Sequence, residues 1–200
     1  MKYKKTKDTG NILRNKKMKE VNQVKKLVIN IFLILTVFII YFLQSNFFTW
    51  FNIAGIMPNL FVVIVLFIGL FASKTMGTIY GIVIGLILDL LFGMSVGIQA
   101  VSLGLIGFLA AAFDKNFSKD SRMTIMLMVL GSTVIVEVLN YLFTYMFEEI
   151  NVEIFSFVKI LVLEVIFNLL LTIILYPLIR KFGYEIENEY KGNKILTRYF

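Results

Sequence analysis

The chain alternates between long apolar stretches and short polar segments, and this alternation predicts an all-α integral membrane protein. A helix of about 20 apolar residues crosses a hydrocarbon core of roughly 30 Å, and six stretches approach that length. Their approximate ranges are 27–43, 59–73, 75–92, 98–113, 123–147 and 157–179. We therefore expect a six-span helical bundle over residues 27–180, with polar tails at 1–26 and 181–200.

The segment between the first two stretches, residues 44–58, mixes aromatic and polar side chains and contains the only tryptophan, Trp50. Aromatic residues are enriched at the membrane–water interface, so this segment is expected to lie at the outer interface or to dip back into the membrane. Pro58 and Asn59 are expected to begin the second helix, because proline is tolerated in a first helical turn.

The third stretch carries small residues at intervals of four. Such rows let two helix backbones approach closely, which is a main source of helix association in lipid. The fourth stretch has small residues of its own, so we expect the third and fourth helices to form a close antiparallel pair. The expected packing or partner-docking positions, which include an aspartate, are Gly77, Gly81, Gly85, Asp89, Gly93, Gly97, Gly104 and Gly107.

The composition fits this interpretation: 58% of the 200 residues are hydrophobic, well above the average for soluble domains. Half of the 20 basic residues precede residue 27. We interpret residues 1–26 as a mostly disordered basic tail that contacts anionic lipid rather than nucleic acid.

The distribution of charge also predicts orientation. With six spans and both termini in the cytoplasm, nineteen of the 20 basic residues lie on the cytoplasmic side. The exception is Lys159, which can extend to the interface near the start of the last span.

Three acids lie inside the apolar stretches: Asp89, Glu137 and Glu164. Acids at membrane depth are costly and normally face the protein interior or water. Asn140 shares a helix face with Glu137, and Asn168 shares one with Glu164, so an inward polar cluster of all five residues is expected. Three interpretations remain open: polar contacts between helices, a small-molecule pocket, or a proton or cation path.

Catalysis is not expected. The chain has neither histidine nor cysteine, which removes the usual general base and thiolate ligands. The sequence Gly93-Met-Ser-Val-Gly97 matches a nucleophile elbow by letters only, because it lies between two apolar stretches and has no histidine base. We expect no cofactor and no metal site, and homo-oligomerisation is left open.

Several of these residues also occur in a familiar order. Pro58-Asn59-Leu60 begins a span, Gly81-Ile-Val-Ile-Gly85-Leu-Ile-Leu-Asp89-Leu-Leu-Phe-Gly93 follows, and then come Gly97 and Gly104-Leu-Ile-Gly107. This order resembles the MreD family of bacterial rod-shape-determining membrane proteins. The resemblance implies a non-catalytic scaffold of the elongation complex in the cell membrane, a partner of MreC that is connected indirectly to MreB, RodA and a penicillin-binding transpeptidase. It also implies a role in fold and partner docking for a set of residues in this order: Pro58, Asn59, Gly81, Gly85, Asp89, Gly93 and Gly97.

The alternative is a substrate-binding subunit of an energy-coupling-factor vitamin transporter, a class with a similar small, glycine-rich, six-span fold. The inward acids and amides would then line a vitamin pocket. Such subunits typically present a small-residue stripe on their first span, whereas residues 27–43 contain no alanine or glycine.

Overall fold

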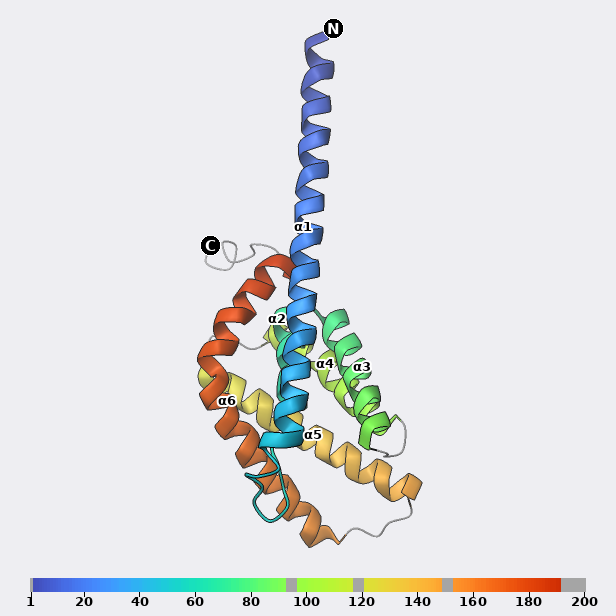
Figure 1. Ribbon diagram of the computed structural model, residues 1–200, viewed down its shortest axis with the longest axis vertical. Coiled ribbons are helices and arrows are strands. Elements are labelled where there is room, and N and C mark those ends of the chain that lie inside the picture. The colour runs from blue at the N-terminus through green and yellow to red at the C-terminus, as the bar shows by residue number, and fades with distance from the viewer. Residues whose placement is uncertain (1, 93–96, 117–120, 149–152, 192–200) are drawn as a thin grey trace.

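The computed structural model describes residues 2–92, 97–116, 121–148 and 153–191, and the regular structure in these residues is helical. Figure 1 shows a helical bundle from which one long helix extends. The elements are α1 (Lys2–Phe42), a π-helical turn η1 (Leu43–Phe47), α2 (Leu60–Phe71), α3 (Lys74–Phe92), α4 (Ile98–Asn116), α5 (Arg122–Glu148) and α6 (Ile154–Lys191). The expectation of an all-α protein is thus confirmed.

Within the described residues, four helical segments are long and apolar enough to cross a membrane. They are Glu20–Phe47, Lys74–Leu91, Arg122–Met146 and Ile154–Lys191. The apolar parts of α2 and α4, Leu60–Phe71 and Ile98–Ala110, are shorter. The 12 residues of α2 rise about 18 Å, well below a hydrocarbon core of about 30 Å.

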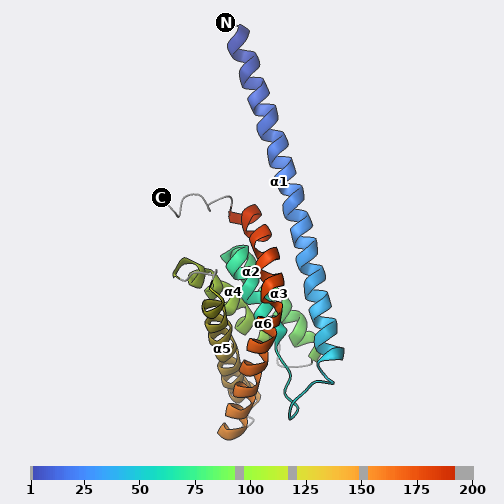
Figure 2. The same cartoon turned by 90° about the vertical axis from the view of Figure 1, so that its left-hand side faces the viewer.

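The short helix α2 forms the centre of the bundle. Every residue of α2 except Ile64 is buried, and α3, α4, α5 and α6 pack around it. Figure 2 shows α1 along one side of this bundle. A helix that is apolar on all sides is stable only when it is enclosed, which explains why α2 lacks a polar face.

The N-terminal segment differs from the expected disordered tail, because residues 2–26 continue the first membrane helix as part of α1. Helix propagation costs little once a helix is nucleated, and this segment contains no proline. The charge pattern gave no information about helicity.

The C-terminal helix continues through Pro177 as far as Lys191. Its last turns contact α1: Lys25 forms an ion pair with Glu189 at 3.0 Å, and the Tyr190 hydroxyl donates to Asn30 Oδ1 at 2.6 Å. The start of α1 and the end of α6 therefore lie at the same end of the molecule (Figures 1 and 2).

The segment after η1 lies at the opposite end of the bundle (Figure 1). It contains a tight turn in which Ile53 and Ile56 exchange two backbone hydrogen bonds of 3.1 and 3.0 Å. Ala54 and Gly55 have positive φ angles of 54° and 82°, as a two-residue turn of this type requires. Trp50 is 89% exposed, so its ring is available to an interface.

Candidate functional site

The glycine row of α3 packs against the backbone of α4. A Cβ atom built on Gly81 would lie against the carbonyl group of Leu103, and one on Gly85 against the backbone of Gln99 and Ala100. These atoms would be closer than 3.0 Å, which Cβ atoms do not reach in real structures. Only glycine permits this approach, and dispersion contacts along the two backbones result.

Three glycines from three helices meet at Gly77, Gly69 and Gly107. A Cβ on Gly77 of α3 would lie 2.5 Å from Gly69 Cα of α2 and 2.7 Å from the carbonyl oxygen of Gly107 of α4. A Cβ on Gly69 would also lie 2.7 Å from that oxygen. Gly69 was missed by the sequence analysis, although it is the only glycine in residues 59–73. Gly104 is less constrained, because its Cβ would meet the flexible side chain of Ile82.

Asp89, which is 1% exposed, accepts hydrogen bonds from the first turn of α4. Its Oδ2 accepts from the backbone N–H of Gly97 at 2.8 Å and of Ala100 at 3.3 Å, and Oδ1 accepts from Gln99 at 3.1 Å. The first N–H groups of a helix have no partner within the helix, and they carry a partial positive charge. Asp89 thus caps α4 from a neighbouring helix.

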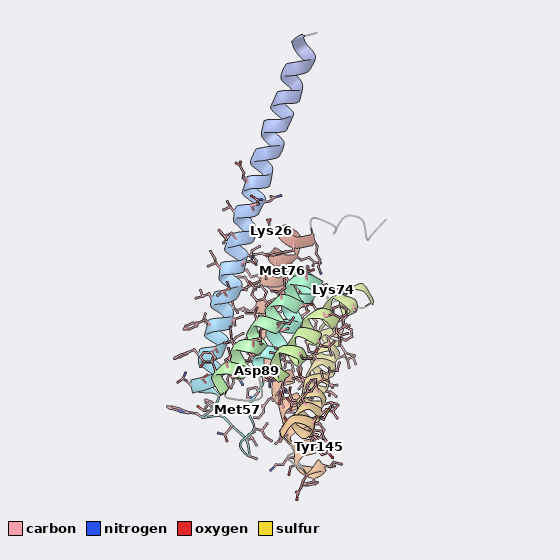
Figure 3. All side chains as sticks on the ribbon, turned by 90° about the vertical axis from the view of Figure 1, so that its right-hand side faces the viewer. Lys26, Met57, Lys74, Met76, Asp89 and Tyr145 are labelled. Carbon is pink, nitrogen blue, oxygen red and sulfur yellow. The ribbon has the colours of Figure 1, made fainter. Side chains whose placement is uncertain are left out.

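One of the expected packing glycines, Gly97, belongs to this cap. Gly97 has a φ angle of 110°, a conformation in which side chains are strained, and it immediately precedes α4. Gly93 lies outside the described residues. In Figure 3, Asp89 lies between Lys26 and Lys74, which are toward the end from which α1 extends, and Tyr145 toward the opposite end.

The N-terminus of α2 is capped in a comparable way. The backbone N–H of Asn59 donates to Asn168 Oδ1 of α6 at 2.8 Å, and the Asn59 side chain accepts from the N–H of Val62 at 3.4 Å. Gln44 Oε1 accepts from the N–H of Leu60 at 3.4 Å, and Gln44 Nε2 donates to the carbonyl oxygen of Pro58. Gln44 was not among the expected site residues; its position directly after the first apolar stretch is the signal that could have indicated it.

Asn168 connects this cap to a wider network between α5 and α6. Its Nδ2 donates to Thr133 Oγ1 at 3.0 Å, and both side chains are fully buried. Glu164, one turn before Asn168, is 6% exposed and lies beside the side chains of Asn59, Asn168 and Glu137.

The network ends at α4. Glu137 lies beside Asn140, and Asn140 Oδ1 accepts a hydrogen bond from the Ser102 hydroxyl at 3.0 Å. Four of the five residues expected in the intramembrane cluster therefore lie in one network: Glu137, Asn140, Glu164 and Asn168. The hydrogen bonds of Asp89 go instead to α4, which the spacing along α3 could not indicate. The sequence analysis did not select Thr133, four residues before Glu137, because the expected cluster was chosen around charged residues and Thr133 has no charge.

The fold and these contacts define a class: a polytopic helical membrane protein in which the buried side chains of Asp89 and Asn168 are hydrogen-bonded to the protein's own backbone and, for Asn168, to Thr133. The family model for the rod shape-determining protein MreD matches residues 25–185. The chain therefore belongs to the MreD family, a structural family of the Mre shape-determining system. No curated protein and no solved structure matches the chain.

Proposed function

We propose that this protein is a non-catalytic scaffold of the bacterial elongation complex, in which it binds MreC and so helps to control cell shape and lateral peptidoglycan synthesis. Membership of the MreD family carries this proposal. MreB, RodA and a penicillin-binding transpeptidase are the indirect partners. The hydrogen bonding supports a structural role, because Asp89 and Asn168 cap helices rather than face a substrate.

We further propose six spans in the bacterial plasma membrane, with both termini in the cytoplasm. The distribution of basic residues supports this topology, as does the location of the start of α1 and the end of α6 at one end of the bundle (Figure 2). The short helix α2 then crosses the membrane together with the segment 44–59 that precedes it. A six-span bundle of this topology is similar to the substrate-binding subunits of energy-coupling-factor transporters.

For the MreC-binding surface we propose the outer face of α1. The glycines of α3 and α4 are occupied by contacts within the chain, so they are not free for a partner. In the most apolar part of Glu20–Phe47, the membrane-crossing part of the first helix, only 6% of the residues are buried against the rest of the protein. Leu35 and Phe38 are 54% and 65% exposed, whereas Leu33 on the same helix is 3% exposed.

The test combines purification with site-specific photo-crosslinking in living cells. The tagged protein is purified in mild detergent, and a photoreactive amino acid is placed at Leu35 or, as the matched control, at Leu33. We expect MreC to co-purify and to cross-link from position 35 but not from 33. Absence of MreC from the purified protein would refute the scaffold, whereas co-purification with equal cross-linking would refute only the proposed surface.

One observation favours the second candidate, a vitamin-binding subunit of an energy-coupling-factor transporter. Glu164 is 6% exposed, and its Oε1 has no hydrogen-bond partner among the described residues. A ligand with a donor group could satisfy this oxygen. Mass spectrometry of the same purified sample tests the candidate: a stoichiometric vitamin together with an ATPase module would support it, and their absence in the presence of MreC would exclude it.

A further inference from the structure

A surface groove lies between the first turn of α5 and the part of α6 that contains Pro177. Its volume is about 260 Å³, and both helices contribute side chains. The groove is separate from the polar network, apart from Thr172, whose hydroxyl donates to the backbone carbonyl of Asn168 at 2.6 Å.

One end of the groove is cationic. Arg122 is the first residue of α5, and its guanidinium group lies 5.3 Å from the centre of the Tyr176 ring. Tyr176 is 6% exposed, so this ring is a fixed platform beneath the charge. A guanidinium group over an aromatic face keeps its edge donors free for an anionic partner, and its planar geometry suits phosphate.

The rest of the groove is apolar and faces the lipid. Ile125 and Met126 line it from α5 and Ile173 lines it from α6, where Ile173 is 49% exposed. Pro177 has no N–H group, so the carbonyl oxygen of Ile173 loses its helical donor. The lining therefore passes from a cation to hydrocarbon, as a phospholipid passes from phosphate to acyl chain.

The position along the chain places this transition at the membrane surface. Arg122 ends the polar segment 114–122, and Arg180 follows Pro177 within one turn. Basic pockets between membrane helices at this level bind acidic lipid headgroups. This argument requires only that α5 and α6 span the membrane, and it does not depend on the scaffold function.

We propose that the groove between Arg122 and Pro177 binds one anionic phospholipid, with its phosphate at the Arg122 guanidinium group and an acyl chain along Ile125, Met126 and Ile173. The bound lipid packs into the lipid-facing crevice between α5 and α6. Charge complementarity identifies the occupant, because a zwitterionic headgroup would place its own cation beside Arg122.

The test uses the full-length protein in lipid nanodiscs that contain phosphatidylglycerol or phosphatidylcholine with a photoreactive acyl chain. Cross-linked residues are mapped by mass spectrometry. We expect phosphatidylglycerol to label residues 125–126 and 173–177 several-fold more than phosphatidylcholine does, and the exposed residue Leu130 to be labelled equally by both.

Three variants separate charge from shape. Arg122→Gln should lower the labelling of the groove by phosphatidylglycerol about fivefold, the effect of one basic residue near a membrane surface, while Arg122→Lys should retain most of it. Ile173→Trp should reduce labelling by both lipids, because it fills the groove. Lys74→Gln is the matched control, since Lys74 also lies over a ring, 3.6 Å from the centre of Phe108, but outside this groove.

The proposal fails if both lipids label the groove equally in the wild type, or if Lys74→Gln lowers labelling as much as Arg122→Gln does. Thermal unfolding of each variant in detergent identifies those that are not folded. If Arg122→Gln does not fold, Arg122→Lys and Ile173→Trp decide the outcome: the proposal is overturned unless the first retains phosphatidylglycerol labelling and the second loses it.

Discussion

Asp89→Asn tests whether the aspartate acts as an acceptor-only helix cap. All three recorded partners of the carboxylate are backbone N–H groups, so neither oxygen requires a proton. An asparagine can keep the two bonds made by Oδ2 by placing its amide oxygen there. Its NH₂ group then faces the N–H of Gln99, donor against donor.

The expected cost combines two effects. A buried N–H left without a partner costs about 1–3 kcal/mol. Loss of the negative charge at the positive end of α4 adds roughly 0.3–1 kcal/mol, and about 2 kcal/mol in partly buried geometries. We therefore expect Asp89→Asn to lower the free energy of unfolding by about 2–4 kcal/mol.

Reversible unfolding in mixed detergent–SDS micelles measures this change directly. Glu164→Gln is the matched control, because the same acid-to-amide exchange occurs there beside a carboxyl group and two amides. The amide groups of Asn59 and Asn168 can both donate and accept hydrogen bonds, so they can adapt to the new side chain and the cost should stay below about 1 kcal/mol. An Asp89→Asn protein within about 0.5 kcal/mol of the wild type would refute the cap, as would an equal loss in both variants.

Three further predictions use the same unfolding assay. Gly107→Ala should destabilise the protein by about 1–3 kcal/mol, because the added methyl group would meet the backbone of Gly77. The control Gly131→Ala, where a Cβ has nothing within 4 Å, should be neutral or stabilising. Equal effects of the two substitutions would contradict the contact between the three glycines. Asn168→Leu should cost about 1–2 kcal/mol, since it removes hydrogen bonds that connect α6 to α2 and α5, and a neutral result would assign the network no role in stability. Deletion of residues 2–20 should leave the free energy of unfolding unchanged, because the ion pair between α1 and α6 is made by Lys25, outside the deleted segment. The deletion should weaken binding to anionic vesicles, because it removes basic residues. Loss of folded protein would show that the extension stabilises the bundle.

The presence of six apolar helices was predictable from the sequence because each contains an apolar stretch, but the ends of α1 and α2 were not. The row Gly77, Gly81 and Gly85 could also be found, since only backbone contact explains small residues at a spacing of four. The length of α2 could not be derived in the same way. Apolar residues before and after a helix look the same in the sequence whether or not the backbone stays helical.

The polar network was predictable in part. Residues four apart on one helix share a face, and this rule grouped Glu164 with Asn168 and Glu137 with Asn140. The rule does not say which helices face each other, so it could not separate Asp89 from these residues. Side-chain spacing also gives no information about which backbone groups need a hydrogen-bond partner, and backbone N–H groups are the partners of Asp89 and of Asn168 Oδ1.

The glycine row and the aspartate of α3 act as one structural device. Gly85 brings the backbone of α3 against Gln99 and Ala100. Asp89 lies one turn further along α3 and accepts hydrogen bonds from the N–H groups of the same two residues. The close approach therefore places the carboxylate within reach of the helix end, where the uncapped N–H groups of α4 would otherwise be costly at membrane depth.

This connection predicts non-additive effects in a double-mutant cycle. Gly85→Ala should displace α4 and weaken the cap, so that Asp89→Asn then removes less. The two changes together should cost at least about 1 kcal/mol less than the sum of the single changes. Gly107→Ala combined with Asp89→Asn is the control, because Gly107 contacts α3 about three turns away, and its effect should add to that of Asp89→Asn. If Gly85→Ala and Asp89→Asn were additive within about 0.5 kcal/mol, the cap would be positioned independently of the glycine contact.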